Sequence, residues 1–115
     1  MFPFSFSTLS TKSTALITRI TSSKNMTPNF IMQTLLDFQL LWITILMLVK
    51  SSNSKIENWN PFSLNIKNEI ETALASIGKN DYHATLAFVR EIPPTLRMVN
   101  TMLDHFANEN ENEIN

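Results

Sequence analysis

Residues 66–106 decide the fold, and they read IKNEIETALASIGKNDYHATLAFVREIPPTLRMVNTMLDHF. In the first part of this stretch an apolar face recurs at helical spacing, formed by Ile66, Ile70, Ala73, Leu74 and Ile77. Such spacing is typical of an amphipathic α-helix. Asn60 and Pro61 can form the cap and first turn of this helix. Gly78 is the only glycine in the chain, and its place predicts a left-handed residue that ends the helix.

Two more helices are predicted, one on each side of the pair Pro93–Pro94. Asn80 or Asp81 can cap the second helix. The apolar face of that helix is formed by Tyr82, Leu86 and Val89. Because proline has no amide hydrogen and disfavours helical geometry in the residue before it, the second helix is expected to end at Ile92. The third helix then carries an apolar face at Leu96, Val99, Leu103 and Phe106.

These segments predict an all-α protein, a small antiparallel helical bundle with a flexible N-terminal tail. The connections between the predicted helices are only a few residues long, which makes the helices antiparallel neighbours. Residues 56–106 would form a helical hairpin plus a third helix. A unit of about 50 residues is marginally stable by itself, so it needs a further helix or a partner to cover its core.

The hydrophobic stretch 30–49 has two interpretations. Fifteen of its 20 residues are strongly apolar, and its length matches a bilayer span. Asp37 opposes a span, because an aspartate near the centre costs about 2.5–3.5 kcal/mol on insertion scales. The alternative is a core helix of the bundle, although residues 40–49 lack the polar stripe that an ordinary bundle helix shows. The sequence therefore predicts a hydrophobic helix, either a core helix or a membrane span.

The two ends of the chain differ in charge. Residues 1–29 are rich in serine and threonine and have basic residues but no acidic ones. This composition predicts either a disordered tail or an organelle-targeting segment. Residues 107–115 alternate asparagine with glutamate and predict a disordered acidic tail. The net charge of −1 gives no overall attraction to nucleic acid or anionic membrane.

No pattern in the chain predicts catalysis, a cofactor site or a metal site. There is no cysteine, and the two histidines, His83 and His105, lie on different predicted helices. A single glycine leaves no glycine-rich phosphate loop. The residues considered for partner contacts are Trp59, Tyr82, Met98 and Met102. For Trp59 the alternative is a core anchor at the helix entry, and for the methionines it is core filling.

Several of these residues resemble a known family. The residues that carry the resemblance are Glu57-Asn-Trp59, the segment Phe62 to Lys67, the helix that contains Ala73 and Leu74, and Asn80-Asp81-Tyr82 followed by Ala84 and Ile92. They resemble the steroid receptor RNA activator protein family, whose module is similar to the C-terminal helical domain of the large COPII outer-coat subunit. The resemblance covers residues 56–106. It implies a helical bundle that acts through protein and RNA partners and has no enzymatic activity.

Two functional hypotheses follow. The first is a non-enzymatic helical adaptor that acts as a transcriptional coregulator or ribonucleoprotein component in the nucleus or cytoplasm. It needs a protein partner, and RNA enters by resemblance only, since the basic residues form no cluster. The alternative is a small single-span membrane protein with a partner-dependent helical domain. It would be anchored through residues 30–49 in a mitochondrial or other intracellular membrane.

Overall fold

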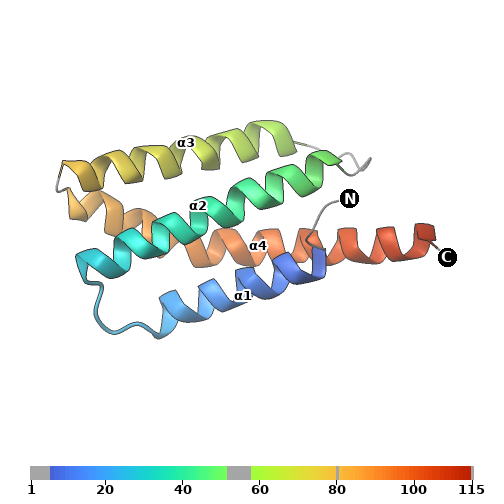
Figure 1. Ribbon diagram of the computed structural model, residues 1–115, viewed down its shortest axis with the longest axis horizontal. Coiled ribbons are helices and arrows are strands. Elements are labelled where there is room, and N and C mark those ends of the chain that lie inside the picture. Colours follow the sequence, from blue (N-terminus) through green and yellow to red (C-terminus); the bar gives the residue numbers. More distant parts are fainter. Residues whose placement is uncertain (1–5, 52–57, 80, 115) are drawn as a thin grey trace.

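The computed structural model describes residues 6–51, 58–79 and 81–114, with side chains up to His105. Throughout these ranges every regular element is a helix: α1 (Phe6–Ser22), α2 (Pro28–Ser51), α3 (Trp59–Gly78) and α4 (Tyr82–Ile114). In Figure 1, α2 crosses in front of α4 and lies between α3 and α1. α4 packs against α1, α3 and α2. The prediction of an all-α helical bundle is confirmed.

The core is centred on α2, which contacts each of the other helices. Its inner face contains nine buried residues: Ile31, Thr34, Leu35, Phe38, Leu41, Trp42, Ile45, Leu48 and Val49. The rings of Trp42 and Trp59 lie 5.9 Å apart between centroids, and Phe38 and Phe88 lie 6.0 Å apart. Trp42 also donates its indole N–H to the carbonyl of Ser63 at 3.2 Å. The largest side chain of the core thereby buries its ring without leaving its polar group unpaired.

α2 begins at a proline with a threonine before it. The hydroxyl of Thr27 accepts a hydrogen bond from the amide of Phe30 at 3.2 Å, and Pro28 occupies the first helical position. The helix then runs for 24 residues. It is long and apolar enough to cross a membrane, with a mean hydropathy of 1.7 over its best 18-residue window, of which 44% is buried by the bundle. The predicted hydrophobic helix is therefore present.

α1 corrects the expectation of a disordered N-terminal tail. It places Leu9, Leu16, Ile17 and Ile20 in the core, and it packs mainly on α4. The many hydroxyl side chains are accommodated because threonines of this helix donate to the carbonyl four residues earlier, at distances of 2.9–3.0 Å for Thr11, Thr14, Thr18 and Thr21. The alternative interpretation, a targeting segment, stays a prediction.

α3 confirms the predicted apolar stripe and the predicted end at Gly78, and it corrects the predicted N-cap. Ile66, Ile70 and Ala73 are buried. The helix begins at Trp59, and its N-cap is Asn58 with φ 63°, so Asn60 is not the cap. The helix ends at Gly78 as predicted, but no described glycine has a positive φ, so the predicted left-handed conformation of Gly78 is wrong. The amides of Lys79 and Asp81 instead bond to the carbonyl of Ser76 at 3.1 and 2.8 Å.

α4 corrects the predicted break at the proline pair. The helix continues through Pro93 and Pro94 and includes 33 residues, about 50 Å at 1.5 Å per residue, which matches the 50 Å length of the molecule. Each interior proline costs about 3 kcal/mol. The helix persists because its apolar face is held on both sides of the pair, with Val89, Ile92, Leu96, Val99 and Leu103 buried. In Figure 1 the light-orange beginning of α4 slopes against the rest of the helix, as prolines commonly cause.

The remaining expectations concern the ends of the predicted segments. Asp81 does cap α4, since its carboxylate accepts a hydrogen bond from the amide of Ala84 at 3.3 Å. The acidic stretch expected to be disordered belongs to α4 up to Ile114, because no glycine or proline interrupts it. Asn80, residues 52–57 and the side chain of Phe106 lie outside what the structure describes.

Candidate interaction surface

The side of α2 that faces away from the core is also apolar. Five large side chains lie on it with 42–68% of their surface exposed: Met32, Leu36, Leu40, Ile43 and Met47. We call these five residues the outer α2 face. Gln33 is the only other exposed residue between Met32 and Met47. A continuous apolar surface of this kind is uncommon on a soluble monomer and marks a site of interaction.

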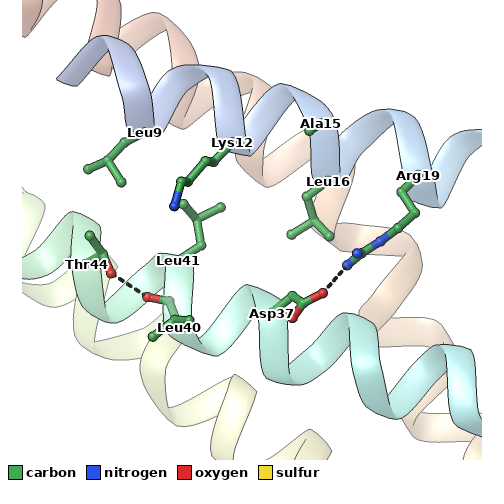
Figure 2. A pocket seen from close by; sticks show the side chains of 9 residues that line it. All are labelled: Leu9, Lys12, Ala15, Leu16, Arg19, Asp37, Leu40, Leu41 and Thr44. Carbon is green, nitrogen blue, oxygen red and sulfur yellow. Dashed lines mark hydrogen bonds and ion pairs between the residues drawn. The ribbon is translucent and has the colours of Figure 1, made fainter. Parts of the chain in front are cut away.

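A groove between α1 and α2 continues the outer α2 face sideways. It has a volume of about 430 Å³, within the range of about 300–1,000 Å³ typical of ligand pockets. Figure 2 shows its two walls, with leucines from both helices directed into it. Its lining residues are Leu9, Lys12, Ala15, Leu16, Arg19, Asp37, Leu40, Leu41 and Thr44. Leu40 belongs to both the groove and the outer α2 face, so the two form one surface.

An ion pair bridges the groove at one end. Arg19 on α1 lies 2.6 Å from the carboxylate of Asp37 on α2, and the amide of Gln33 donates to the same carboxylate at 3.1 Å (Figure 2 shows the ion pair). The two charged side chains are 42% and 37% exposed. Because the pair is partly solvated, its contribution to stability is small. Its main effect is to neutralise the only charge within the apolar part of α2.

The groove also has a polar side chain that is satisfied locally. The hydroxyl of Thr44 donates to the carbonyl of Leu40 at 2.8 Å, as Figure 2 shows. That bond uses up the hydroxyl hydrogen within α2 itself. The apolar character of the groove is therefore set by its leucines, and its polar character by Lys12 and the Arg19–Asp37 pair.

The four residues predicted for partner contacts do not come together. Trp59 is only 8% exposed and packs on Trp42 and Phe62, so the core-anchor interpretation describes it and a surface role is corrected. Tyr82 is half-buried, and Met102 is half-buried against the core. Met98 alone is strongly exposed, at 54%, and it lies on α4. None of the four belongs to the outer α2 face.

Sequence reasoning missed the outer α2 face as a site, although its signal was present. Residues 40–49 lack the polar stripe that an ordinary bundle helix shows. The side chains that stand where a polar stripe would lie include Leu40, Ile43 and Met47, which belong to the outer α2 face. What the sequence could not show was which apolar residues of α2 would be covered by other helices.

No group of three or more histidine, aspartate or glutamate side chains able to hold a metal ion occurs in the part of the chain that the structure describes. Family models, curated proteins and solved structures were all compared with the chain, and none matches it. The resemblance of residues 56–106 to the steroid receptor RNA activator family stays a prediction.

Proposed function

We propose that this protein is a non-enzymatic helical adaptor that binds a partner protein through the outer α2 face. The observation that carries the proposal is the exposure of five large apolar side chains in one line along a helix. Leaving these side chains in water is unfavourable by about 25 cal/mol for each Å² of apolar surface. A partner that covers them gains this free energy on binding.

The shape of the surface favours a helical partner. The outer α2 face is long and narrow, and the groove beside it has apolar walls on α1 and α2. Amphipathic helices bind surfaces of this kind through apolar side chains at a spacing of three and four residues. A partner helix would place its apolar side along α2 and keep its polar side in water.

The surface favours protein over RNA. Binding to RNA depends on lysine and arginine side chains that contact phosphates. Between Met32 and Met47, α2 has no lysine or arginine, and its one charged side chain is the acidic Asp37, paired with Arg19. The role as a transcriptional coregulator or ribonucleoprotein component, in the nucleus or cytoplasm, rests on the resemblance alone, and in this proposal RNA would be reached through the protein partner.

Site-specific photo-crosslinking tests the proposal. A photoreactive amino acid at Ile43, on the outer α2 face, is expected to capture a discrete protein in cells. The same amino acid at Glu71, exposed on α3, is the matched control and is expected to capture none. Equal capture at both positions, or no protein captured at Ile43, would contradict the proposal.

The second candidate is a single-span membrane protein, favoured by the length and hydropathy of α2. Two aspartate substitutions separate the candidates. In the bundle, Leu35→Asp buries a charge and unfolds the protein, whereas Leu40→Asp lies on the surface and preserves the fold. In a membrane span both substitutions cost about 2.5–3.5 kcal/mol, and both reduce insertion.

Alkaline carbonate extraction tests directly whether the protein is integrated in a membrane. The adaptor is expected in the supernatant, as are the variants that remain folded. Recovery of the unmodified protein in the pellet, soluble in detergent, would instead establish the membrane span. Circular dichroism of purified Leu35→Asp and Leu40→Asp completes the test, because only the bundle predicts a difference in helical content between them.

A further inference from the structure

The spacing along the outer α2 face is that of a helix–helix seam. Leu36, Leu40, Ile43 and Met47 follow one another at intervals of four, three and four residues. Two helices that pack with a small crossing angle meet through side chains at this alternation. The seam spans 12 residues, about 18 Å of helix at 1.5 Å per residue.

The seam is also symmetric about its own centre, which lies between Leu41 and Trp42. Reversing the direction of the helix exchanges Leu36 with Met47 and Leu40 with Ile43, so large apolar residues fall on large apolar residues. Gln33 lies three residues before the seam and Lys50 three residues after it, so the same reversal exchanges these two residues. Both are exposed, so an apolar centre is bracketed by two polar residues.

The charges distinguish an antiparallel from a parallel pair of such helices. In a parallel pair Lys50 would lie beside Lys50 of the other copy, and two like charges repel. In the antiparallel pair Lys50 lies beside the neutral Gln33. Antiparallel helices also oppose their macrodipoles, which is favourable. The one charged residue of α2 between Met32 and Met47 is Asp37, and it is paired with Arg19, so this part of α2 presents no unpaired charge that would select a charged partner.

We propose that the partner on the outer α2 face is a second copy of this chain, packed antiparallel through α2. The proposal rests on the proposed function of this face as a protein-binding surface. The resulting dimer has a two-fold axis near the middle of α2, and each copy contributes the same residues to the interface. In the dimer, Leu36 contacts Met47 of the other copy and Leu40 contacts Ile43.

Single cysteines test this register cleanly, because the chain has none of its own. Leu36→Cys and Met47→Cys are purified separately and as a refolded mixture, then oxidised mildly. The mixture is expected to form a disulfide between position 36 of one copy and position 47 of the other, identified by peptide mass. Each variant alone is expected to remain uncrosslinked, because its two cysteines lie at opposite ends of the seam. Lys67→Cys, exposed on α3, is the control and is expected not to crosslink.

Analytical ultracentrifugation of the full chain measures the dimer itself. The unmodified protein is expected at twice the mass of one chain. Leu40→Lys places an ammonium group in the seam and is expected to raise the dissociation constant of the dimer at least about tenfold. The same variant should keep its helical content, since the side chain at position 40 is exposed within one copy. Leu64→Lys, exposed on α3, should leave the dimer unchanged.

Three results would overturn the proposal in different ways. A monomer at all concentrations that still crosslinks another protein through Ile43 rejects the dimer and keeps the adaptor. A monomer without any crosslinked protein rejects both. Disulfides formed by Leu36→Cys alone and by Met47→Cys alone show a parallel pair and reject the antiparallel register.

Discussion

The inner and outer faces of α2 are built from similar apolar side chains, but only the inner face is covered by other helices. The inner face includes the aromatic residues Phe38 and Trp42, which contact rings on α3 and α4. The outer α2 face has leucine, isoleucine and methionine and no aromatic ring. Aromatic side chains bury large areas and hold neighbouring elements together. The position of the rings, more than hydropathy, therefore decides which side of α2 becomes the core.

Replacing the ring of Trp42 is expected to change the free energy of unfolding more than any other substitution considered on α2. Trp42→Ala removes the largest buried side chain of α2 and leaves the carbonyl of Ser63 without its donor. The free energy of unfolding should fall by about 3–5 kcal/mol. Urea unfolding followed by circular dichroism measures the change. Leu64→Ala, at an exposed position on α3, is the control, and a loss below about 1 kcal/mol for Trp42→Ala would show that the inner face is not the core.

The same substitution on each face of α2 gives a matched pair. Leu35 is fully buried, and Leu35→Ala should lower the free energy of unfolding by about 2–5 kcal/mol. Leu40 is 68% exposed, and Leu40→Ala should change the stability of the single chain by no more than about 0.5 kcal/mol. Both are measured at protein concentrations where the chain is monomeric. Equal losses would contradict the assignment of inner and outer faces.

A buried hydroxyl on the inner face offers a substitution that should stabilise the protein. Thr34 is 1% exposed, and its hydroxyl has no hydrogen-bond partner among the residues that the structure describes. Thr34→Val keeps the shape and removes the unpaired polar group, so the midpoint of urea unfolding should rise by an amount equivalent to about 1 kcal/mol. Thr44→Val is the control, since the hydroxyl of Thr44 is bonded and half-exposed. A lower midpoint for Thr34→Val would mean that this hydroxyl is satisfied.

The smallest effect is expected at the boundary between the two faces. Asp37→Asn breaks the ion pair with Arg19, but both side chains are more than one-third exposed. The free energy of unfolding should therefore change by less than about 1 kcal/mol. The difference should shrink further in 1 M salt, where charges are screened within about 3 Å. A larger effect that persists in high salt would mark the pair as a structural anchor of α1.

Much of the fold was predictable where a local pattern and its packing agree. The stripe Ile66–Ile70–Ala73 is buried, Asp81 caps the following helix, and the hydrophobic stretch 30–49 forms one helix. These features depend on spacing and on hydrogen bonds between residues close in sequence. They require no knowledge of distant contacts.

The errors arise where distant contacts outweigh local preference. Pro93 and Pro94 oppose a helix, yet buried residues on both sides of the pair keep α4 continuous. α1 has the composition of a disordered tail, and it is ordered by contacts with α4. Distant contacts also decide the candidate site. Trp59 was predicted as a possible contact residue, but Trp42, 17 positions earlier, and Phe62 pack against its ring in the core. The outer α2 face could be recognised only after the covered side of α2 was known.

The packing of α1 on α4 has a consequence for the synthesis of the chain. Ser10 bonds to Asp104 and Asn100 bonds to Thr14, at separations of 94 and 86 residues. α1 leaves the ribosome before α2, α3 and α4, and it therefore meets its main neighbour only when α4 has emerged. Until then the apolar residues of α1 and α2 that pack on α4 are left uncovered by it, and exposed apolar surface makes a nascent chain prone to aggregation. The four-helix bundle can close only after α4 has been synthesised.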